Sequence, residues 1–345
     1  MNMLFQSQPP VLVVDNLSLE FTNGPSRIHA LDGVSFGLAR GETLCLVGES
    51  GCGKSVTAMA LMRLLPKSSA RITSGAIRLT GTDLIGLPER SMQTIRGNRI
   101  GMVFQDPMTS LNPVHTVGMQ IAETVRRHKR VGRREAYARA RQMLDLVRIP
   151  DAGNRLNAYP HELSGGQRQR VMIAMALACD PELLIADEPT TALDVTVQAQ
   201  ILELIADLKT ELGMSVLLIT HDLGVVAATA DRMMVMYAGR IVEEGPVERI
   251  FARPSHGYTA GLLRSLPGHG AARRGTLTEI VGTVPRLDRP VEGCVYAPRC
   301  GFAEAGCTAS LPPAREIEAG HRSSCIREAA VFAAMRDHDI VRSWA

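Results

Sequence analysis

The sequence contains no apolar run long enough to cross a membrane. A spanning helix needs roughly 18 or more consecutive apolar residues, whereas the longest run here, Val171 to Cys179, has nine. The stretch from Met1 to Ser7 also lacks the basic segment and the apolar core of a secretory signal peptide. We therefore expect an unexported chain in the cytosol, where its seven cysteines stay reduced.

The sequence also has little excess charge of either sign. The formal net charge of +3 is too small to predict a nucleic-acid partner by itself. The strongest basic run, Arg126 to Arg134, contains no aromatic residues for base stacking. We therefore expect a solvated helix face and loop there, with contacts to RNA or lipid head groups as the less favoured alternative.

Residues 48–55 match the spacing of a phosphate-binding loop (P-loop), G-x-x-x-x-G-K-[ST]. The apolar run from Thr43 to Val47 predicts a strand before this loop, and Val56 to Met62 predict a helix after it. Glycines let backbone N–H groups close around phosphate oxygens, and the helix N-terminus adds partial positive charge. Lys54 is expected to reach the β- and γ-phosphates of a nucleotide, and Ser55 to bind Mg²⁺.

One aromatic residue joins the predicted nucleotide contacts. Phe21 is suitably placed before the loop to stack on an adenine ring, although a plain core residue of a strand is an equally good reading. The predicted ATP-binding residues are Phe21, Gly48, Glu49, Ser50, Gly51, Cys52, Gly53, Lys54, Ser55 and Val56.

Two carboxylates end the buried strand predicted over residues 183–188. Asp187 is placed to hold Mg²⁺ through water, and Glu188 to polarise a water molecule that attacks the γ-phosphate. Burying an unpaired carboxylate at a strand end costs free energy. We therefore interpret the two carboxylates as catalytic residues and not as structural ones.

Two further polar residues follow predicted strands. Gln105 ends the strand predicted over residues 100–104 and is expected to face Mg²⁺ or the attacking water. His221 ends the strand predicted over residues 215–220, at the strand end where open α/β sheets bind ligands, and is expected to contact the γ-phosphate. The predicted catalytic residues are Glu188, His221 and Gln105.

A second glycine motif, Leu163 to Gln167, opens the helix predicted over residues 168–179. Ser164, Gly165 and Gly166 at a helix N-terminus form an anion-binding cradle, although the same residues also serve as a plain N-cap. Helical periodicity over residues 116–130 and 133–148 predicts a helical subdomain, about residues 108–166, inserted into the α/β core.

Taken in order, these motifs resemble the nucleotide-binding domain of an ABC ATPase over residues about 11–255. The Leu-Ser-Gly-Gly-Gln signature separates this class from P-loop kinases and GTPases. Finer features are similar to the ATP-binding subunits of bacterial dipeptide/oligopeptide importers. They are residues 104–113, residues 187–198, and the tail motifs Arg289-Pro290, Gly293-Cys294 and Pro298-Arg299-Cys300. Gly257 departs from the family, which usually has Pro there.

The resemblance implies a fold, a mechanism and partners. The fold is a P-loop α/β core with an antiparallel β subdomain and the helical insertion. Two such domains, expected as a heterodimer, sandwich two ATP molecules, so Ser164, Gly165, Gly166 and Gln167 act on the partner's nucleotide, and Asp194 lies in the D-loop. ATP binding and hydrolysis would drive two membrane permeases and, indirectly, an extracytoplasmic peptide-binding protein, with this chain peripheral on the cytoplasmic face of the bacterial inner membrane.

The substrate stays open at this point. Peptides are the expected cargo, and nickel, glutathione or an oligosaccharide is the alternative, because membrane and binding subunits select the solute. A non-transport ABC ATPase is less favoured, because such proteins usually carry two ATPase domains or a long coiled-coil insertion. No nucleic-acid partner is expected.

Four cysteines gather in the C-terminal segment, residues 256–345, which we expect to form a small loop-rich domain. Four thiolates can ligate Zn²⁺ or an iron–sulfur cluster, and the two tight C-x₂₋₄-C knuckles common in zinc sites are absent. The family resemblance implies a [4Fe–4S] cluster, with Zn²⁺ as the alternative, at Cys294, Cys300, Cys307 and Cys325. Cys45, Cys52 and Cys179 are expected to be core or loop residues.

Overall fold

The computed structural model describes residues 9–24, 26–106, 110–191, 193–266, 280–285, 287–288 and 291–336. The chain divides into two compact units. Unit 1 comprises Met1–Leu12, Leu38–Thr43 and Arg78–Ile219, and unit 2 comprises Val13–Gly37, Leu44–Ile77 and Thr220–Ala345. The predicted domain boundary after residue 255 stays a prediction.

Three parallel strands form the centre of unit 1, in the order β8-β7-β6. Their bounds are Ser215–Thr220, Leu183–Asp187 and Ile100–Val103, and every residue in them is buried. Continuous apolar runs are typical of strands buried on both faces. Val103 pairs with Ala186 and Asp187 pairs with Ile219, so the carboxyl ends of the three strands lie together.

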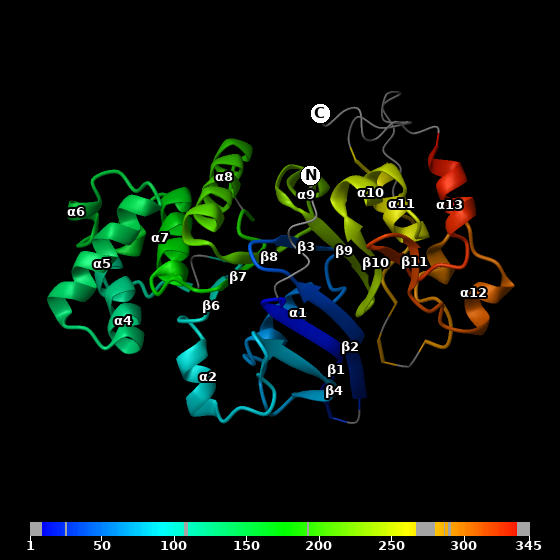
Figure 1. Cartoon of the computed structure of the whole chain (residues 1–345), viewed down its shortest axis with the longest axis horizontal. Coiled ribbons are helices and arrows are strands. Elements are labelled where there is room, and N and C mark those ends of the chain that lie inside the picture. Colours follow the sequence, from blue (N-terminus) through cyan, green and yellow to red (C-terminus); the bar gives the residue numbers. More distant parts are fainter. Residues whose placement is uncertain are drawn as a thin grey trace. The chain divides into compact units, whose positions relative to one another are not determined.

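Helices account for most of the rest of unit 1. The largest group is α4 (Val117–Lys129), α5 (Arg133–Leu146) and α7 (Gly165–Leu177), which pack against one another beside the short α6 (Ala152–Arg155) (Figure 1). The predicted apolar faces form this packing, because Ile121, Val125 and Met143 are buried. The remaining elements are β5 (Thr82–Asp83), α2 (Glu89–Ile95), η1 (Pro160–Glu162) and α8 (Val195–Leu212).

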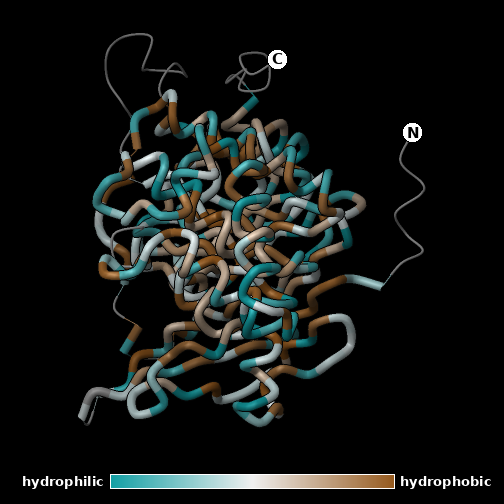
Figure 2. Tube along the Cα trace, turned by 90° about the vertical axis from the view of Figure 1, so that its left-hand side faces the viewer, coloured by the Kyte–Doolittle hydropathy of each residue, from teal (hydrophilic) through white to brown (hydrophobic). Residues whose placement is uncertain are grey.

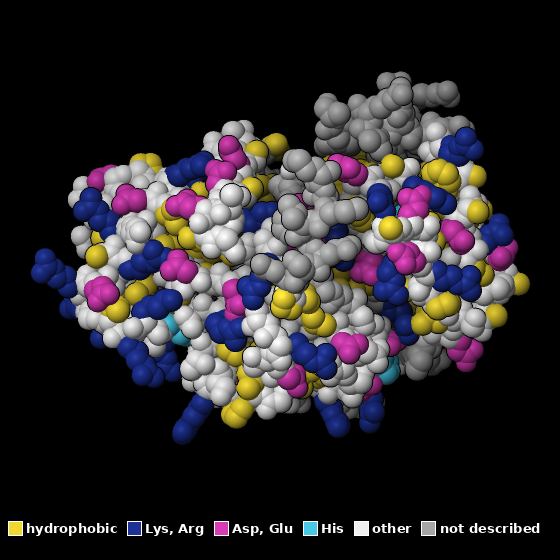
Figure 3. Space-filling model, viewed as in Figure 1, with side chains coloured by type: hydrophobic (Ala, Val, Ile, Leu, Met, Phe, Trp, Pro, Cys, Tyr) yellow, Lys and Arg dark blue, Asp and Glu magenta, His cyan; other side chains and the backbone are white. Residues whose placement is uncertain are grey.

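The basic run between α4 and α5 is exposed. Arg126, Arg127, Lys129 and Arg130 all face solvent, as do Arg133 and Arg134. Figure 3 shows dark blue basic side chains over these helices, with magenta acidic side chains among them. The run is exposed, as a solvated helix face requires, and the expectation that it has no RNA or lipid partner stays a prediction.

In unit 2 a sheet has the strand order β11-β12-β10-β9-β3. Strands β3 (Thr43–Val47) and β9 (Arg232–Tyr237) are parallel, whereas β9, β10, β12 and β11 pair antiparallel in turn. The further bounds are β10 (Arg240–Pro246), β11 (Arg315–Glu318) and β12 (His321–Ser323). The helices are α1 (Lys54–Leu61), α9 (Leu223–Thr229), α10 (Val247–Ala252), α11 (Gly257–Arg264), η3 (Ala297–Arg299), α12 (Ala305–Ala309) and α13 (Glu328–Met335).

A second sheet brings β2 (Ser26–Leu38), β1 (Leu12–Asn23) and β4 (Ala70–Leu79) side by side in that order. The sequence predicts two short strands before residue 22, but the structure has one continuous strand, β1. Asn16 takes a left-handed φ of 48° inside it, a conformation that Asn tolerates better than most residues. The predicted break is therefore wrong, because Asn16 absorbs the change of direction without ending the strand.

Within the described residues, we find no helix that combines the length and the apolar character needed to cross a lipid bilayer. In Figure 2, short hydrophobic (brown) stretches of the coloured trace alternate with hydrophilic (teal) ones.

A buried carboxylate joins the C-terminal segment to β10. Glu243 accepts hydrogen bonds from the backbone N–H groups of Ser255 (2.8 Å) and His256 (2.9 Å), and it lies 2.8 Å from His321 Nε2. The side chains of Glu243 and His321 are both 0% exposed. Because a buried carboxylate is stable only when its oxygens are satisfied, these three contacts fix β12 and the start of α11 relative to β10.

Replacing Glu243 with Ala leaves two backbone N–H groups and an imidazole without their acceptor. We expect Glu243→Ala to lower the free energy of unfolding by about 3–5 kcal/mol, measured by urea denaturation. The control is Asp207→Ala, because Asp207 pairs at 2.6 Å with Arg148 and the two side chains are 52% and 53% exposed; such exposed pairs contribute about 0–1 kcal/mol. Equal losses in the two variants would contradict the role of Glu243.

Candidate active site

The P-loop takes the conformation that its glycines predict. Strand β3 ends at Val47 and α1 begins at Lys54, so residues 48–53 form the loop. A Cβ atom on Gly48 would lie 2.2 Å from the carbonyl oxygen of Met236 on β9. Gly53 has a φ of 112°, and a Cβ atom there would lie 3.0 Å from the carbonyl oxygen of Ala30. Only glycine fits both places, because the backbone of the loop passes directly against its neighbours.

Lys54 is folded back onto the loop. Its side chain is buried (5% exposed), and Nζ donates to the carbonyl oxygens of Gly48 (2.7 Å) and Glu49 (3.0 Å). Ser55, the second residue of α1, is exposed. The ammonium group therefore lies inside the loop, within reach of an anion held by the loop's N–H groups.

Two residues of the C-terminal segment hold the second P-loop residue, Glu49. The hydroxyl of Tyr258 accepts a hydrogen bond from the Glu49 backbone N–H at 2.7 Å. Arg299 Nη1 donates to Glu49 Oε2 at 2.8 Å. The sequence predicts neither contact, because the Pro-Arg-Cys motif at residues 298–300 indicates the family resemblance and the cysteine site but no partner for Arg299.

The carboxylates lie at the end of β7 in unit 1. Asp187 is buried, with 6% of its surface exposed, and Glu188 takes a left-handed φ of 46°. Glu188 Oε2 accepts hydrogen bonds from Gln105 Nε2 (3.1 Å) and from the Thr191 hydroxyl (3.0 Å). A non-glycine residue in this conformation costs about 1–3 kcal/mol and is typical of functional sites. The structure thus brings Gln105 and Glu188 together and adds Thr191, which the sequence analysis did not predict.

The Leu-Ser-Gly-Gly-Gln motif begins α7 in the way its sequence predicts. The Ser164 side chain accepts from the Gln167 N–H, and the Gln167 side chain accepts from the Ser164 N–H, which completes a capping box. Gly166 lies against α8, since a Cβ atom there would be 2.8 Å from Val197 Cγ1. Asp194 caps α8 by accepting from the Val197 N–H at 2.9 Å. Ser164 and Gly165 are exposed, so a partner molecule can reach them.

The other predicted residues lie as follows. Phe21 is half-buried on β1, and His221 is exposed after β8; both belong to unit 2, like the P-loop. Their predicted contacts with adenine and with the γ-phosphate stay predictions. Among the motif residues, Ala192, Pro107 to Thr109, and Arg289-Pro290 lie outside the described residues.

The loop fits a nucleoside triphosphate with its Mg²⁺. Its glycines let the loop backbone pass directly against Met236 and Ala30 and keep the conformation of a phosphate-binding loop, and Lys54 supplies the positive charge. The exposed Ser55 hydroxyl is the type of oxygen ligand that Mg²⁺ takes in such loops. The bound nucleotide supplies the reactive γ-phosphoryl group.

The predicted iron–sulfur cluster is wrong. No group of three or more His, Cys, Asp or Glu side chains within the described residues could hold a metal ion. The four tail cysteines do line one cavity together with His256, but its volume of about 10 Å³ is room for about one water molecule. Burial raises the pKa of Cys294 and Cys300, and it raises that of Cys325 to about 12. The described residues therefore provide no site for the predicted cluster or for Zn²⁺.

The cysteine cavity also explains the glycine at position 257. Gly257 opens α11, and a Cβ atom there would lie 2.7 Å from Cys300 Sγ. The nearby His256 ring is fully buried, which lowers the pKa of His256 to about 4. The His256 ring is therefore neutral near pH 7, and it packs closely with the cysteines around this cavity.

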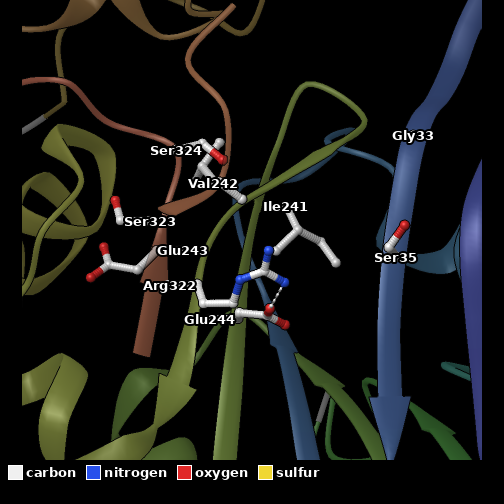
Figure 4. Close-up of a pocket in the computed structure, with 10 residues that line it drawn as sticks. Gly33, Ser35, Ile241, Val242, Glu243, Glu244, Arg322, Ser323 and Ser324 are labelled. Carbon is white, nitrogen blue, oxygen red and sulfur yellow. Dashed lines mark hydrogen bonds and ion pairs between the residues drawn. The ribbon is translucent and has the colours of Figure 1, made fainter. Parts of the chain in front are cut away.

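A second cavity, shown in Figure 4, lies between β2, β10 and β12 and has a volume of about 210 Å³. Arg322 and Glu244 form an ion pair across it, with Ser35, Ser323 and Ser324 nearby (Figure 4). None of the residues that line it is a predicted nucleotide contact.

The close approach of Gly48 to Met236 gives a direct test of the loop. We expect Gly48→Ala to abolish measurable ATP binding and to lower the free energy of unfolding by about 1–3 kcal/mol, because the methyl group forces β9 and the loop apart. Titration with a fluorescent ATP analogue and urea denaturation measure the two effects. The control is Gly301→Ala, where a Cβ atom meets nothing within 4 Å; unchanged ATP affinity in Gly48→Ala would contradict the geometry.

Comparison with known proteins agrees with this site. Residues 31–191 match the family described as ABC transporter, and residues 242–307 match the oligopeptide/dipeptide transporter C-terminal region. A probable peptide ABC transporter ATP-binding protein of Sinorhizobium fredii is 56% identical over 94% of this chain and 98% of its own length. A putative peptide import ATP-binding protein of Brucella melitensis is 53% identical over 93% of this chain and 98% of its own.

Solved structures give the same fold. A dimeric, post-hydrolysis ATP-binding cassette bound to ADP and phosphate aligns with a TM-score of 0.62 and 29% identity, covering 68% of this chain and 98% of that one. CbiO1 of Clostridium perfringens, part of an ABC transporter complex, aligns with a TM-score of 0.61 and 28% identity, covering 72% of this chain and 92% of that one. The predicted P-loop α/β ATPase fold is confirmed. The chain therefore belongs to the ATP-binding subunits of peptide ABC transporters, and it is an ATPase.

Proposed function

We propose that the P-loop of this chain binds the ATP that it hydrolyses, and that Lys54 is the residue that changes partners when ATP arrives. The carbonyl oxygens of Gly48 and Glu49 hold the ammonium group within the loop. An incoming triphosphate offers stronger, charged acceptors, so Lys54 turns from the two carbonyls to the β- and γ-phosphates. Ser55 would ligate the Mg²⁺ that accompanies the nucleotide, and Asp187 would hold this ion through water. The observation that carries this proposal is the loop geometry at Gly48 and Gly53.

Glu188 is the proposed general base. Its Oε2 atom already accepts hydrogen bonds from the side chains of Gln105 and Thr191. These two donors fix the orientation of the carboxylate, which we propose takes a proton from water as that water attacks the γ-phosphate. We propose that Gln105 orients the water or would ligate Mg²⁺, and that His221 contacts the γ-phosphate.

Ser164 to Gln167 act in the proposed mechanism on a nucleotide bound by a second ATPase subunit. The capping box aims the N-terminus of α7 outward, with Ser164 and Gly165 exposed. Free N–H groups at a helix start favour an anion such as the γ-phosphate. Two ATPase subunits, proposed as a heterodimer, would close on two ATP molecules and reopen after hydrolysis.

The cargo that this cycle moves is proposed to be a dipeptide or an oligopeptide. The match of residues 242–307 and the names of the relatives support this substrate class. Two permease subunits and a peptide-binding protein outside the membrane complete the proposed importer, with this chain on its cytoplasmic face. Import of a labelled dipeptide into cells that depend on this subunit tests the substrate, since Lys54→Ala should abolish it.

Glu188→Gln tests the catalytic step. We expect ATP affinity to stay within about twofold, because the amide keeps the shape of the side chain, while kcat falls at least about 100-fold without a base. Phosphate release measures turnover, and titration with a fluorescent ATP analogue measures binding.

The matched control is Glu182→Gln, which removes a carboxylate paired 2.6 Å from Arg99 at the start of β7. This variant should keep its turnover. Near-normal phosphate release by Glu188→Gln would remove Glu188 as the base.

A further inference from the structure

The P-loop contains an acidic residue next to the place where a polyanion binds. Glu49 follows Gly48, whose carbonyl oxygen holds Lys54, and the Glu49 carbonyl oxygen holds the same ammonium group. A free carboxylate at this position repels the triphosphate, because like charges a few ångströms apart interact strongly at a partly buried site. The carboxylate is 26% exposed and is turned to Arg299, 2.8 Å away.

Arg299 has all of its donors committed. Besides Glu49, its Nη1 donates to the Tyr237 hydroxyl at 3.1 Å. Its other nitrogens donate to three consecutive carbonyl oxygens, those of Ile280 (3.0 Å), Val281 (2.9 Å) and Gly282 (3.1 Å). A guanidinium has five N–H donors, so these five contacts fix it in one orientation. The side chain is 7% exposed, and it reaches no other carboxylate in these contacts.

A cluster of three tyrosines supports this arginine. The rings of Tyr237, Tyr258 and Tyr296 lie with their centroids 4.6 to 5.3 Å apart, and the Arg299 guanidinium lies 5.7 Å from the centre of the Tyr237 ring. Tyr258 also accepts the Glu49 N–H. The Glu49 backbone and carboxylate are thus held by two residues from the C-terminal segment, at sequence separations of 209 and 250.

We propose that Arg299 is a positioning residue for ATP: it neutralises the Glu49 carboxylate and holds it away from the phosphates while Tyr258 fixes the Glu49 backbone. This inference rests on the proposed role of the P-loop as the ATP site. When Lys54 leaves the carbonyls of Gly48 and Glu49 for the phosphates, the loop loses two internal hydrogen bonds. The contacts from Arg299 and Tyr258 remain, so the loop keeps its shape.

The proposal gives the C-terminal segment a function in nucleotide binding. Both Tyr258 and Arg299 lie within residues 242–307, the part that matches the oligopeptide/dipeptide transporter region. Neither residue reaches a phosphate group by itself in the contacts described, so the expected effect is on ATP affinity and not on the chemical step.

The test compares KM and kcat for ATP in the full chain. We expect Arg299→Met to raise KM about tenfold, as one uncompensated charge near the triphosphate predicts, while kcat stays within about twofold. Arg299→Lys, which keeps the charge without the fork of donors, should raise KM less. The decisive variant is the double mutant Arg299→Met with Glu49→Gln, in which no carboxylate is left to compensate. Its KM should return to within about threefold of the wild-type value.

The control is Arg322→Met, because Arg322 also lies in the C-terminal segment and pairs with a carboxylate, Glu244, in the cavity of Figure 4. Its KM should stay unchanged. An unchanged KM in Arg299→Met would overturn the proposal, and so would a raised KM that Glu49→Gln does not restore, since that result indicates a purely structural role. Lys54→Ala distinguishes failure of the Arg299 proposal from failure of the proposed ATP site. If the Lys54→Ala variant still binds ATP normally, the P-loop is not the ATP site.

Discussion

The close passage of the P-loop backbone beside β9 is the constraint on which the nucleotide site depends. No atom can be added at Gly48 without meeting the Met236 carbonyl oxygen. This close approach fixes the position of the loop relative to β9. It therefore also fixes the position of Lys54, whose ammonium group binds the loop carbonyl oxygens. The loop is built of backbone, not of side chains, because only backbone N–H groups are small enough and numerous enough to surround a phosphate.

The position of the proposed general base depends on a different local feature, the left-handed backbone conformation of Glu188. A strand that continued straight after Asp187 would place successive side chains on opposite faces of the sheet. The turn at Glu188 breaks this alternation and brings its carboxylate to Gln105 and Thr191. The strain in the backbone is thus tied to the position of the proposed base.

Two buried ionisable side chains are among the contacts that join the C-terminal segment to the rest of unit 2. Glu243 binds the start of α11 and β12 through a buried carboxylate, and Arg299 binds the P-loop through a buried guanidinium. Buried ionisable groups are costly unless fully hydrogen-bonded, and both of these residues are. The four tail cysteines are free thiols that line a cavity of about 10 Å³. In the described part of the segment, hydrogen bonds join it to the rest of unit 2, and no metal-binding group is found there.

The sequence by itself determined the fold class, most helices and strands, and the two glycine motifs. These features can be predicted because apolar periodicity, capping residues and glycine spacing involve only residues that are close together in the sequence. The sequence placed Gln105 and Glu188 at the carboxyl ends of two predicted strands, but their hydrogen bond appears only in the structure, where those two parallel strands are neighbours. The cysteine spacing, in contrast, predicted a cluster that the tertiary structure does not form, since spacing does not fix the directions of four thiols. Only the tertiary structure decided that Arg299 and Tyr258 hold Glu49, because contacts across more than two hundred residues are set by packing and leave no periodic signal in the sequence.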